Sequence, residues 1–116
     1  MTVMMQISLW LNIAVLVPVL VALAIDRPGV VEVFGARSPA RGILQSIYFS
    51  ILVVSAGLLV VQDPRAIAAL LVVQIVYKLT TPFTVGRWTN PVVLSNLAIT
   101  AVHLATVWSS REQLLG

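Results

Sequence analysis

Cysteine is absent from this chain, and charged residues make up only 9% of it. The missing cysteine excludes disulfides, thiolate metal sites and cysteine nucleophiles. Soluble proteins average about 25% charged residues, so the scarcity of charge excludes an ordinary soluble domain. The seven Lys and Arg residues are dispersed without a basic run, which argues against nucleic acid as a partner despite the net charge of +3.

The long apolar stretches also lack acidic residues, because every Asp and Glu lies in an expected connection or in the tail. A proton or cation antiporter needs an acid inside the membrane, so this class is disfavoured. There is no Ser-His-acid set, no pair of catalytic carboxylates and no glycine-rich phosphate loop, so we lean against an enzyme. A lone histidine without embedded acids or cysteines cannot complete a metal site, and no cofactor is indicated.

The chain is instead rich in apolar sequence, which accounts for 59% of its 116 residues. A membrane helix needs about 20 mostly apolar residues, and four stretches reach that range, at residues 3–25, 42–61, 66–85 and 92–108. Short connections place each helix antiparallel to the one before it. The sequence therefore predicts an all-α polytopic membrane protein, with residues 1–116 folded as one antiparallel four-helix bundle.

The first apolar stretch has a second interpretation, a cleaved signal peptide, because Ala22-Leu23-Ala24 resembles a cleavage site. Signal peptides begin with basic residues, and no Lys or Arg precedes this stretch. We therefore expect a retained membrane helix.

Residues 26–41 form the only sizeable polar connection. Its centre, VVEVF, is compatible with an interfacial strand or a short helix, because five residues do not define a periodicity. We expect an ordered loop at the membrane surface here, and a short polar tail after residue 108.

The distribution of Lys and Arg near the helix ends predicts the orientation. One side carries Arg27, Arg37, Arg41 and Arg87, whereas the other carries Arg65, Arg111 and the terminal amine. We expect a multi-pass protein of a prokaryotic inner (cytoplasmic) membrane, with both termini facing away from the cytoplasm.

Polar residues recur at helical spacing in each span, and the candidate site residues among them are Asn12, Tyr48, Gln74, Lys78, Asn96 and His103. Residues three or four apart share a helix face, and in lipid a polar face turns inward. We expect a polar column, with Tyr48, Lys78 and Asn96 toward the side of the first and third connections, Asn12 and His103 toward the other side, and Gln74 between them. The alternative is that these side chains only join helices, at about 0.6 kcal/mol per hydrogen bond.

Lys78 is the most informative of these residues. A lysine at mid-membrane costs roughly 2.5–3.5 kcal/mol on insertion scales, so it needs a partner, a hydrated cavity or a route to the headgroups. His103 is interpreted as a structural histidine, with a proton-responsive or ligand-contacting role as the alternative.

The segment ARGILQSIYFSILVVSAGLL, residues 40–59, opens on an arginine, carries an aromatic near its middle and ends near Ala56-Gly57. It resembles the second helix of DoxX-like small four-helix membrane proteins. This resemblance implies a subunit or helper of a membrane redox system, and it transfers no individual site residue.

Three functions fit these observations. The first is association, as an accessory subunit of a membrane complex or a self-associating bundle, with the bilayer and copies or other membrane subunits as partners. The second is a small transporter or channel for an anion or polar solute, using the column around Lys78. The third is a lipid- or quinone-binding component of a membrane redox system, in which Lys78 and Tyr48 meet a headgroup.

Overall fold

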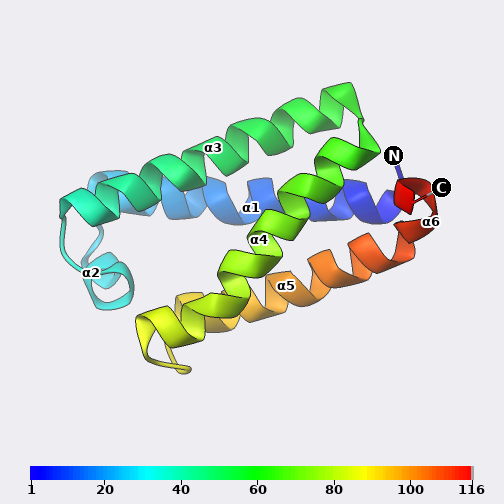
Figure 1. Ribbon diagram of the computed structural model, residues 1–116. Helices are drawn as coiled ribbons and strands as arrows, with labels where there is room; N and C mark the ends of the chain where they lie inside the picture. Colours follow the sequence, from blue (N-terminus) through cyan, green and yellow to red (C-terminus); the bar gives the residue numbers. More distant parts are fainter. Residues whose placement is uncertain (116) are drawn as a thin grey trace.

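The computed structural model describes residues 1–115, and within them the chain folds into helices joined by short turns (Figure 1). The helices are α1 (Val3–Ile25), α2 (Pro28–Phe34), α3 (Pro39–Val61), α4 (Pro64–Val85), α5 (Pro91–Ser109) and α6 (Arg111–Leu115). Four of them, α1, α3, α4 and α5, are long and apolar enough to cross a membrane. The predicted all-α fold with four spanning helices is confirmed.

Three of the spanning helices begin with a polar cap followed by proline. The side chains of Ser38, Asp63 and Asn90 accept hydrogen bonds from the backbone N–H groups of Arg41, Arg65 and Val92. Such caps satisfy the free N–H groups of a first turn, and proline in that turn has no N–H to satisfy. The caps and prolines extend both helices beyond the starts predicted from the sequence. Helix α3 begins at Pro39, not at residue 42, and α4 begins at Pro64, not at residue 66.

The prediction of an ordered loop over residues 26–41 is wrong at its centre, because Pro28–Phe34 forms the helix α2. Val30 is buried against the bundle, and the Phe34 ring packs edge-on against Tyr48, with centroids 6.2 Å apart. The Asn90 side chain donates a hydrogen bond to the carbonyl of Val33, 3.1 Å away, near the carboxyl end of α2. The polar tail is likewise partly helical, as α6.

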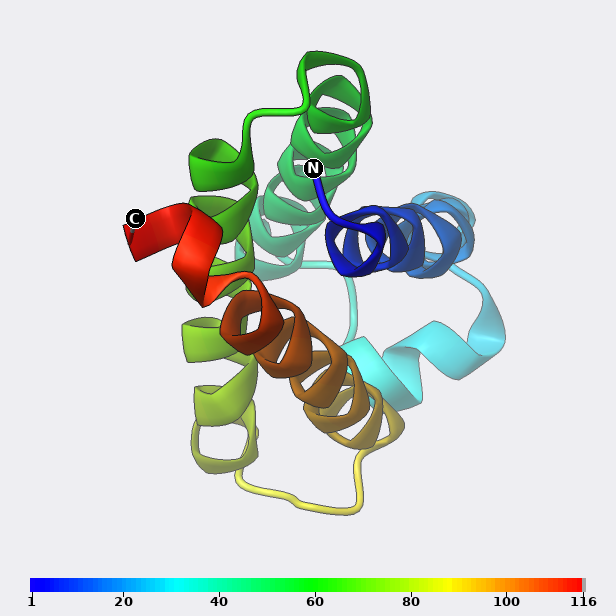
Figure 2. The ribbon, with the colours of Figure 1, turned by 90° about the vertical axis from the view of Figure 1, so that its right-hand side faces the viewer.

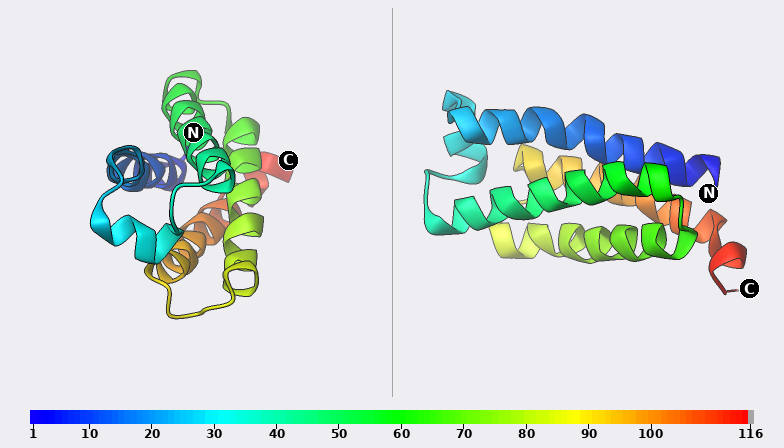
Figure 3. Two further views of the ribbon diagram at one scale, coloured as in Figure 1. Left: turned by 90° about the vertical axis from the view of Figure 1, so that its left-hand side faces the viewer. Right: turned by 90° about the horizontal axis from the view of Figure 1, so that it is seen from above.

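The four spanning helices run alternately up and down (Figures 1 and 3). Helix α1 lies beside α3 and α4 lies beside α5, whereas α3 and α4 diverge from their shared turn (Figure 1). Both termini lie at one end of the bundle, and the α4–α5 turn lies at the other. Helix α2 lies at that other end, between the ends of α1 and α5 (Figures 2 and 3).

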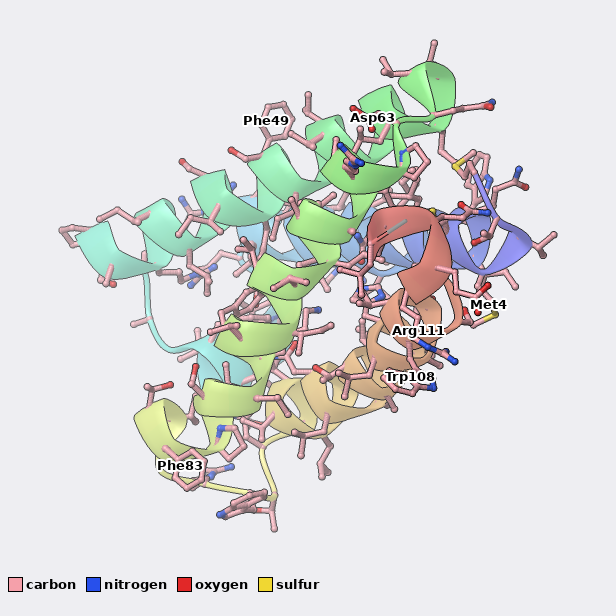
Figure 4. The ribbon with its side chains drawn as sticks, turned by 45° about the vertical axis from the view of Figure 1, so that its right-hand side comes forward. Met4, Phe49, Asp63, Phe83, Trp108 and Arg111 are labelled. Atoms are coloured by element: carbon pink, nitrogen blue, oxygen red, sulfur yellow. The ribbon has the colours of Figure 1, made fainter. Side chains whose placement is uncertain are left out.

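Aromatic side chains mark both ends of the bundle (Figure 4). At one end the rings of Phe83 and Trp88 pack edge-to-face, 5.7 Å apart. At the other end the Arg111 guanidinium lies over the ring of Trp108, 4.2 Å from its centroid. Exposed tryptophans at two levels are typical of the two membrane–water interfaces, so this spacing fits a bundle that spans the bilayer.

Arg41 links the connection that contains α2 to the end of α1. Its guanidinium is buried, pairs with Asp26 at 2.7 Å, and donates to the carbonyls of Leu23 and Gly35 at 3.0 and 3.1 Å. Asp26 has a left-handed backbone with φ of 54°, which ends α1. One arginine thus donates to a carbonyl in the last turn of α1 and links the two ends of the connection that contains α2.

Replacing Asp26 with Asn should destabilise the fold by about 1–2 kcal/mol, because it leaves the buried Arg41 charge without its counter-ion. Asparagine tolerates the left-handed conformation, so the backbone is kept. The unfolding midpoint in detergent micelles measures this effect. Glu32→Gln, which removes an exposed acid on α2, is the control. Equal midpoints for the two variants would contradict a structural role for the ion pair.

Candidate functional site

The six candidate residues predicted from the sequence are all buried within the bundle. They do not form one uniform column. Asn12, Gln74 and His103 belong to a hydrogen-bonded cluster in the half nearer the termini. Tyr48, Lys78 and Asn96 line a cavity in the half nearer α2.

His103, on α5, lies at the centre of the hydrogen-bonded cluster and is fully buried. Its Nε2 atom lies 3.0 Å from the amide oxygen of Asn12 and 3.3 Å from that of Gln74. Carbonyl oxygens only accept hydrogen bonds, so Nε2 donates to both. The Nδ1 atom meets the hydroxyl of Ser8 at 3.0 Å. Both ring nitrogens are therefore satisfied by protein groups.

The cluster continues into every spanning helix. The Asn12 amide donates to the Ser55 hydroxyl at 3.1 Å, and the hydroxyls of Ser8 and Thr106 are 2.6 Å apart. We call this set the His103 cluster: Ser8 and Asn12 on α1, Ser55 on α3, Gln74 on α4, and His103 and Thr106 on α5. Because water is scarce in the bilayer, these polar side chains form hydrogen bonds with one another that they would otherwise form with solvent. The same contacts hold the four helices in one register.

The cavity lies between the His103 cluster and α2, and its volume is about 200 Å³. We call it the Lys78 cavity; it is lined by residues of α1 to α5, namely Val15, Leu16, Val19, Phe34, Tyr48, Tyr77, Lys78, Pro91, Val92, Ser95 and Asn96. Leu16, Tyr48, Lys78 and Asn96 are buried and form its inner wall. Pro91 and Ser95 are exposed, so the cavity opens on the outer side of the bundle between α1 and α5.

Lys78 stays inside the bundle rather than extending to the headgroups, and only 5% of it is exposed. It lies seven residues before the end of α4 at Val85, or about 10 Å along the helix axis. Its ammonium lies 5.5 Å from the centroid of the Tyr77 ring. Among residues 1–115 no side chain accepts a hydrogen bond from this ammonium and no carboxylate pairs with it.

A second cavity of about 260 Å³ adjoins the first on the side of α2. The two share Phe34, Tyr48, Tyr77, Val92 and Asn96, so only these side chains separate them. Small-molecule sites usually measure roughly 300–1,000 Å³, a range that the two cavities reach only when taken together.

Sequence reasoning missed some of the residues that build these sites. Thr106 follows His103 by three residues, a spacing that puts both on one helix face and could have been used to find it. Phe34 could not be found in this way, because it reaches the cavity from α2. Gln45 precedes Tyr48 by three residues on α3, yet it lies half-buried in a groove on the outer side of α1 and α3.

Two further observations limit the chemistry. Within the described residues, no group of three or more His, Cys, Asp or Glu side chains could hold a metal ion. Comparison of the chain with protein-family models, with curated proteins and with solved structures found no match. The function is therefore inferred from the geometry of the His103 cluster and the Lys78 cavity.

Thr106→Val should destabilise the bundle by about 1 kcal/mol, since the hydroxyl contacts Ser8 and donates to the carbonyl of Val102 at 2.9 Å. Thr100→Val is the matched control on the same helix. The Thr100 hydroxyl is buried without a partner, so its removal should be neutral or slightly stabilising. Unfolding free energies in mixed micelles compare the two. A larger loss for Thr100→Val would contradict the hydrogen-bond assignment.

Proposed function

We propose that this protein binds a small amphiphilic molecule, a lipid or a quinone, which enters the Lys78 cavity from the bilayer. The observation that carries the proposal is a buried lysine whose ammonium has no hydrogen-bond acceptor or ion-pair partner among residues 1–115, in a cavity whose other walls are mostly apolar. An intramembrane charge is costly when unpaired, and such residues usually mark ligand or transport sites. A ligand with a polar head and an apolar body would match both parts of the cavity.

The position of the opening supports entry from lipid. Its rim is formed by Val15 and Val19 of α1 and by Pro91 and Ser95 of α5, all at least partly exposed. Ser95 lies about 6 Å along α5 from Pro91, the first residue of this helix. The opening therefore extends from the end of α5 toward the middle of the bundle. A molecule dissolved in the bilayer would reach the cavity without crossing the headgroups.

Binding is better supported than passage of a solute. The His103 cluster lies between the Lys78 cavity and the end that carries the termini, and its side chains are in hydrogen-bonding contact across all four spanning helices. A solute moving along the bundle axis would have to break several of these contacts. A ligand in the Lys78 cavity leaves the cluster intact.

Blocking the cavity should abolish binding. A 12-carbon diazirine amphiphile in phosphatidylcholine nanodiscs serves as the probe, with an alcohol and a carboxylate as alternative heads. Illumination should label peptides that line the Lys78 cavity, and Val15→Trp should reduce this labelling to background by filling the opening. Val17→Trp, on the lipid-exposed face of the same helix, should retain it. Absence of cavity labelling with both heads would overturn the proposal.

Association with other membrane proteins is the second candidate, supported by the outer groove of α1 and α3. Leu20, Ala24, Gly42, Gln45, Ser46, Phe49 and Ser50 line this groove. Gln45 makes no hydrogen bond within the described residues, and an amide facing lipid gains from a partner helix. The resemblance of residues 40–59 to DoxX-like proteins would make that partner a membrane redox subunit, with this chain as its accessory.

Ser46→Phe should break such an association by filling the groove. Val53→Phe, on the exposed face of α3 away from the groove, is its control. Native mass spectrometry from nanodiscs measures the assembly. A homo-oligomer or a second subunit lost only in Ser46→Phe would support this role, and a wild-type monomer without a second subunit would exclude it.

A further inference from the structure

A cavity with two arginines in its wall lies at the end of the bundle that carries α2. Its volume is about 170 Å³, and it lies between the end of α1 and the start of α3. We call it the Arg37 cavity; it is lined by Leu23, Arg37, Ser38, Arg41, Gly42 and Gln45. It shares none of these residues with the Lys78 cavity, so the two are separate sites.

The protein satisfies the Arg37 guanidinium only in part, and 63% of the side chain is exposed. Its Nη2 atom donates to the carbonyl of Ala24 at 2.8 Å, and its Nε atom lies 3.6 Å from the Asp26 carboxylate. A guanidinium has five N–H donors, and among residues 1–115 the Nη1 atom makes no hydrogen bond. Arg41 pairs with the same carboxylate, so one negative charge serves two positive charges and one positive charge is left over.

The Arg37 cavity continues into the outer groove of α1 and α3, because Gly42 and Gln45 line both. Along α3, Gln45 lies about 6 Å and Phe49 about 12 Å from Arg41, toward the middle of the bundle. Figure 4 shows Phe49 on the side of α3 that faces away from α5. From the end of the bundle inward, the path therefore presents guanidinium groups, then an amide, then apolar side chains.

A phospholipid carries its chemical groups in the same order, with phosphate at the membrane surface, ester carbonyls below it and acyl chains beneath. Guanidinium groups bind phosphate with paired hydrogen bonds, and basic pockets between membrane helices bind anionic lipid heads. The Gln45 amide makes no hydrogen bond within the described residues, so it is free to donate to an ester carbonyl. A partner helix would fill the groove but would leave Arg37 without an anion.

We infer that the Arg37 cavity and the outer groove together bind one anionic phospholipid. This inference goes beyond the proposed function and does not depend on the Lys78 cavity. The phosphate pairs with the Nη1 atom of Arg37, the Gln45 amide donates to an ester carbonyl, and an acyl chain lies against Leu20 and Phe49. A zwitterionic head would bring a further cation beside the two arginines, so a head without one is preferred.

The first test is native mass spectrometry of the full chain in neutral detergent, titrated with dioleoyl phosphatidylglycerol or dioleoyl phosphatidylcholine. Phosphatidylglycerol should bind about fivefold more tightly, which corresponds to about 1 kcal/mol, the usual contribution of one arginine beside anionic lipid. Arg37→Gln should abolish this preference. Arg87→Gln, which removes an exposed arginine from the α4–α5 turn at the same end of the bundle, should retain it. Equal affinities for the two lipids in the unmodified protein, or equal losses in the two variants, would overturn the inference.

The second test closes the passage between the Arg37 cavity and the groove. Gly42→Leu should lower the affinity for phosphatidylglycerol to that for phosphatidylcholine, whereas Gly57→Leu, on α3 outside the groove, should leave it unchanged. A Cβ atom at either glycine meets nothing within 4 Å, so both variants should fold. Their unfolding midpoints should not fall, because leucine favours a helix more than glycine does. An unchanged affinity in Gly42→Leu would overturn the placement of the lipid.

Competitors separate this lipid from other occupants. Displacement of phosphatidylglycerol by glycerol 3-phosphate would assign the cavity to a free phosphate, and binding of oleate as tight as that of phosphatidylglycerol would remove the need for a phosphate; either result would overturn the inference. A dimer that excludes the lipid and is lost in Ser46→Phe would assign the groove to a second copy and would also overturn it. None of these results bears on labelling of the Lys78 cavity, so the proposed function is tested separately.

Discussion

The scarcity of water inside a bilayer is the constraint on which this structure depends. In a soluble protein an unsatisfied amide or hydroxyl can turn to solvent, but in the spans of this chain it must find a partner within the bundle. The His103 cluster meets this requirement, because both nitrogens of the imidazole contact groups from other helices. Gln74 and Thr100 meet this requirement only in part, because the amide nitrogen of Gln74 and the hydroxyl of Thr100 are buried without a hydrogen-bond partner in the described residues.

The two halves of the bundle are therefore packed differently. In the half nearer the termini, the His103 cluster and the apolar packing of Met5, Leu9 and Leu71 close the space between the helices. In the other half, α3 and α4 have diverged, and α2 lies between the ends of α1 and α5 (Figures 2 and 3). The Arg41–Asp26 pair matters here, because it holds the two ends of the connection that carries Phe34 to the cavity wall.

The sequence was sufficient for the parts of the fold that depend on length and periodicity. Four apolar stretches gave the four spanning helices, and the spacing of polar residues correctly placed Asn12, Gln74 and His103 on buried faces. It could not give α2, which depends on contacts with Tyr48 and Asn90, residues that are distant in the chain. Nor could it divide the polar column into a closed cluster and a cavity, since that depends on how far neighbouring helices separate.

The cavity is also asymmetric with respect to the membrane. Lys78 lies about 10 Å from the end of α4, and the hydrocarbon core of a bilayer is about 30 Å thick. The opening between α1 and α5 therefore faces only one leaflet, the one adjoining α2 and the α4–α5 turn. Under the proposed binding function, a ligand would be drawn from that leaflet only, and a molecule of the opposite leaflet would have to flip before it could enter. The orientation of the chain would thus determine which leaflet supplies the ligand.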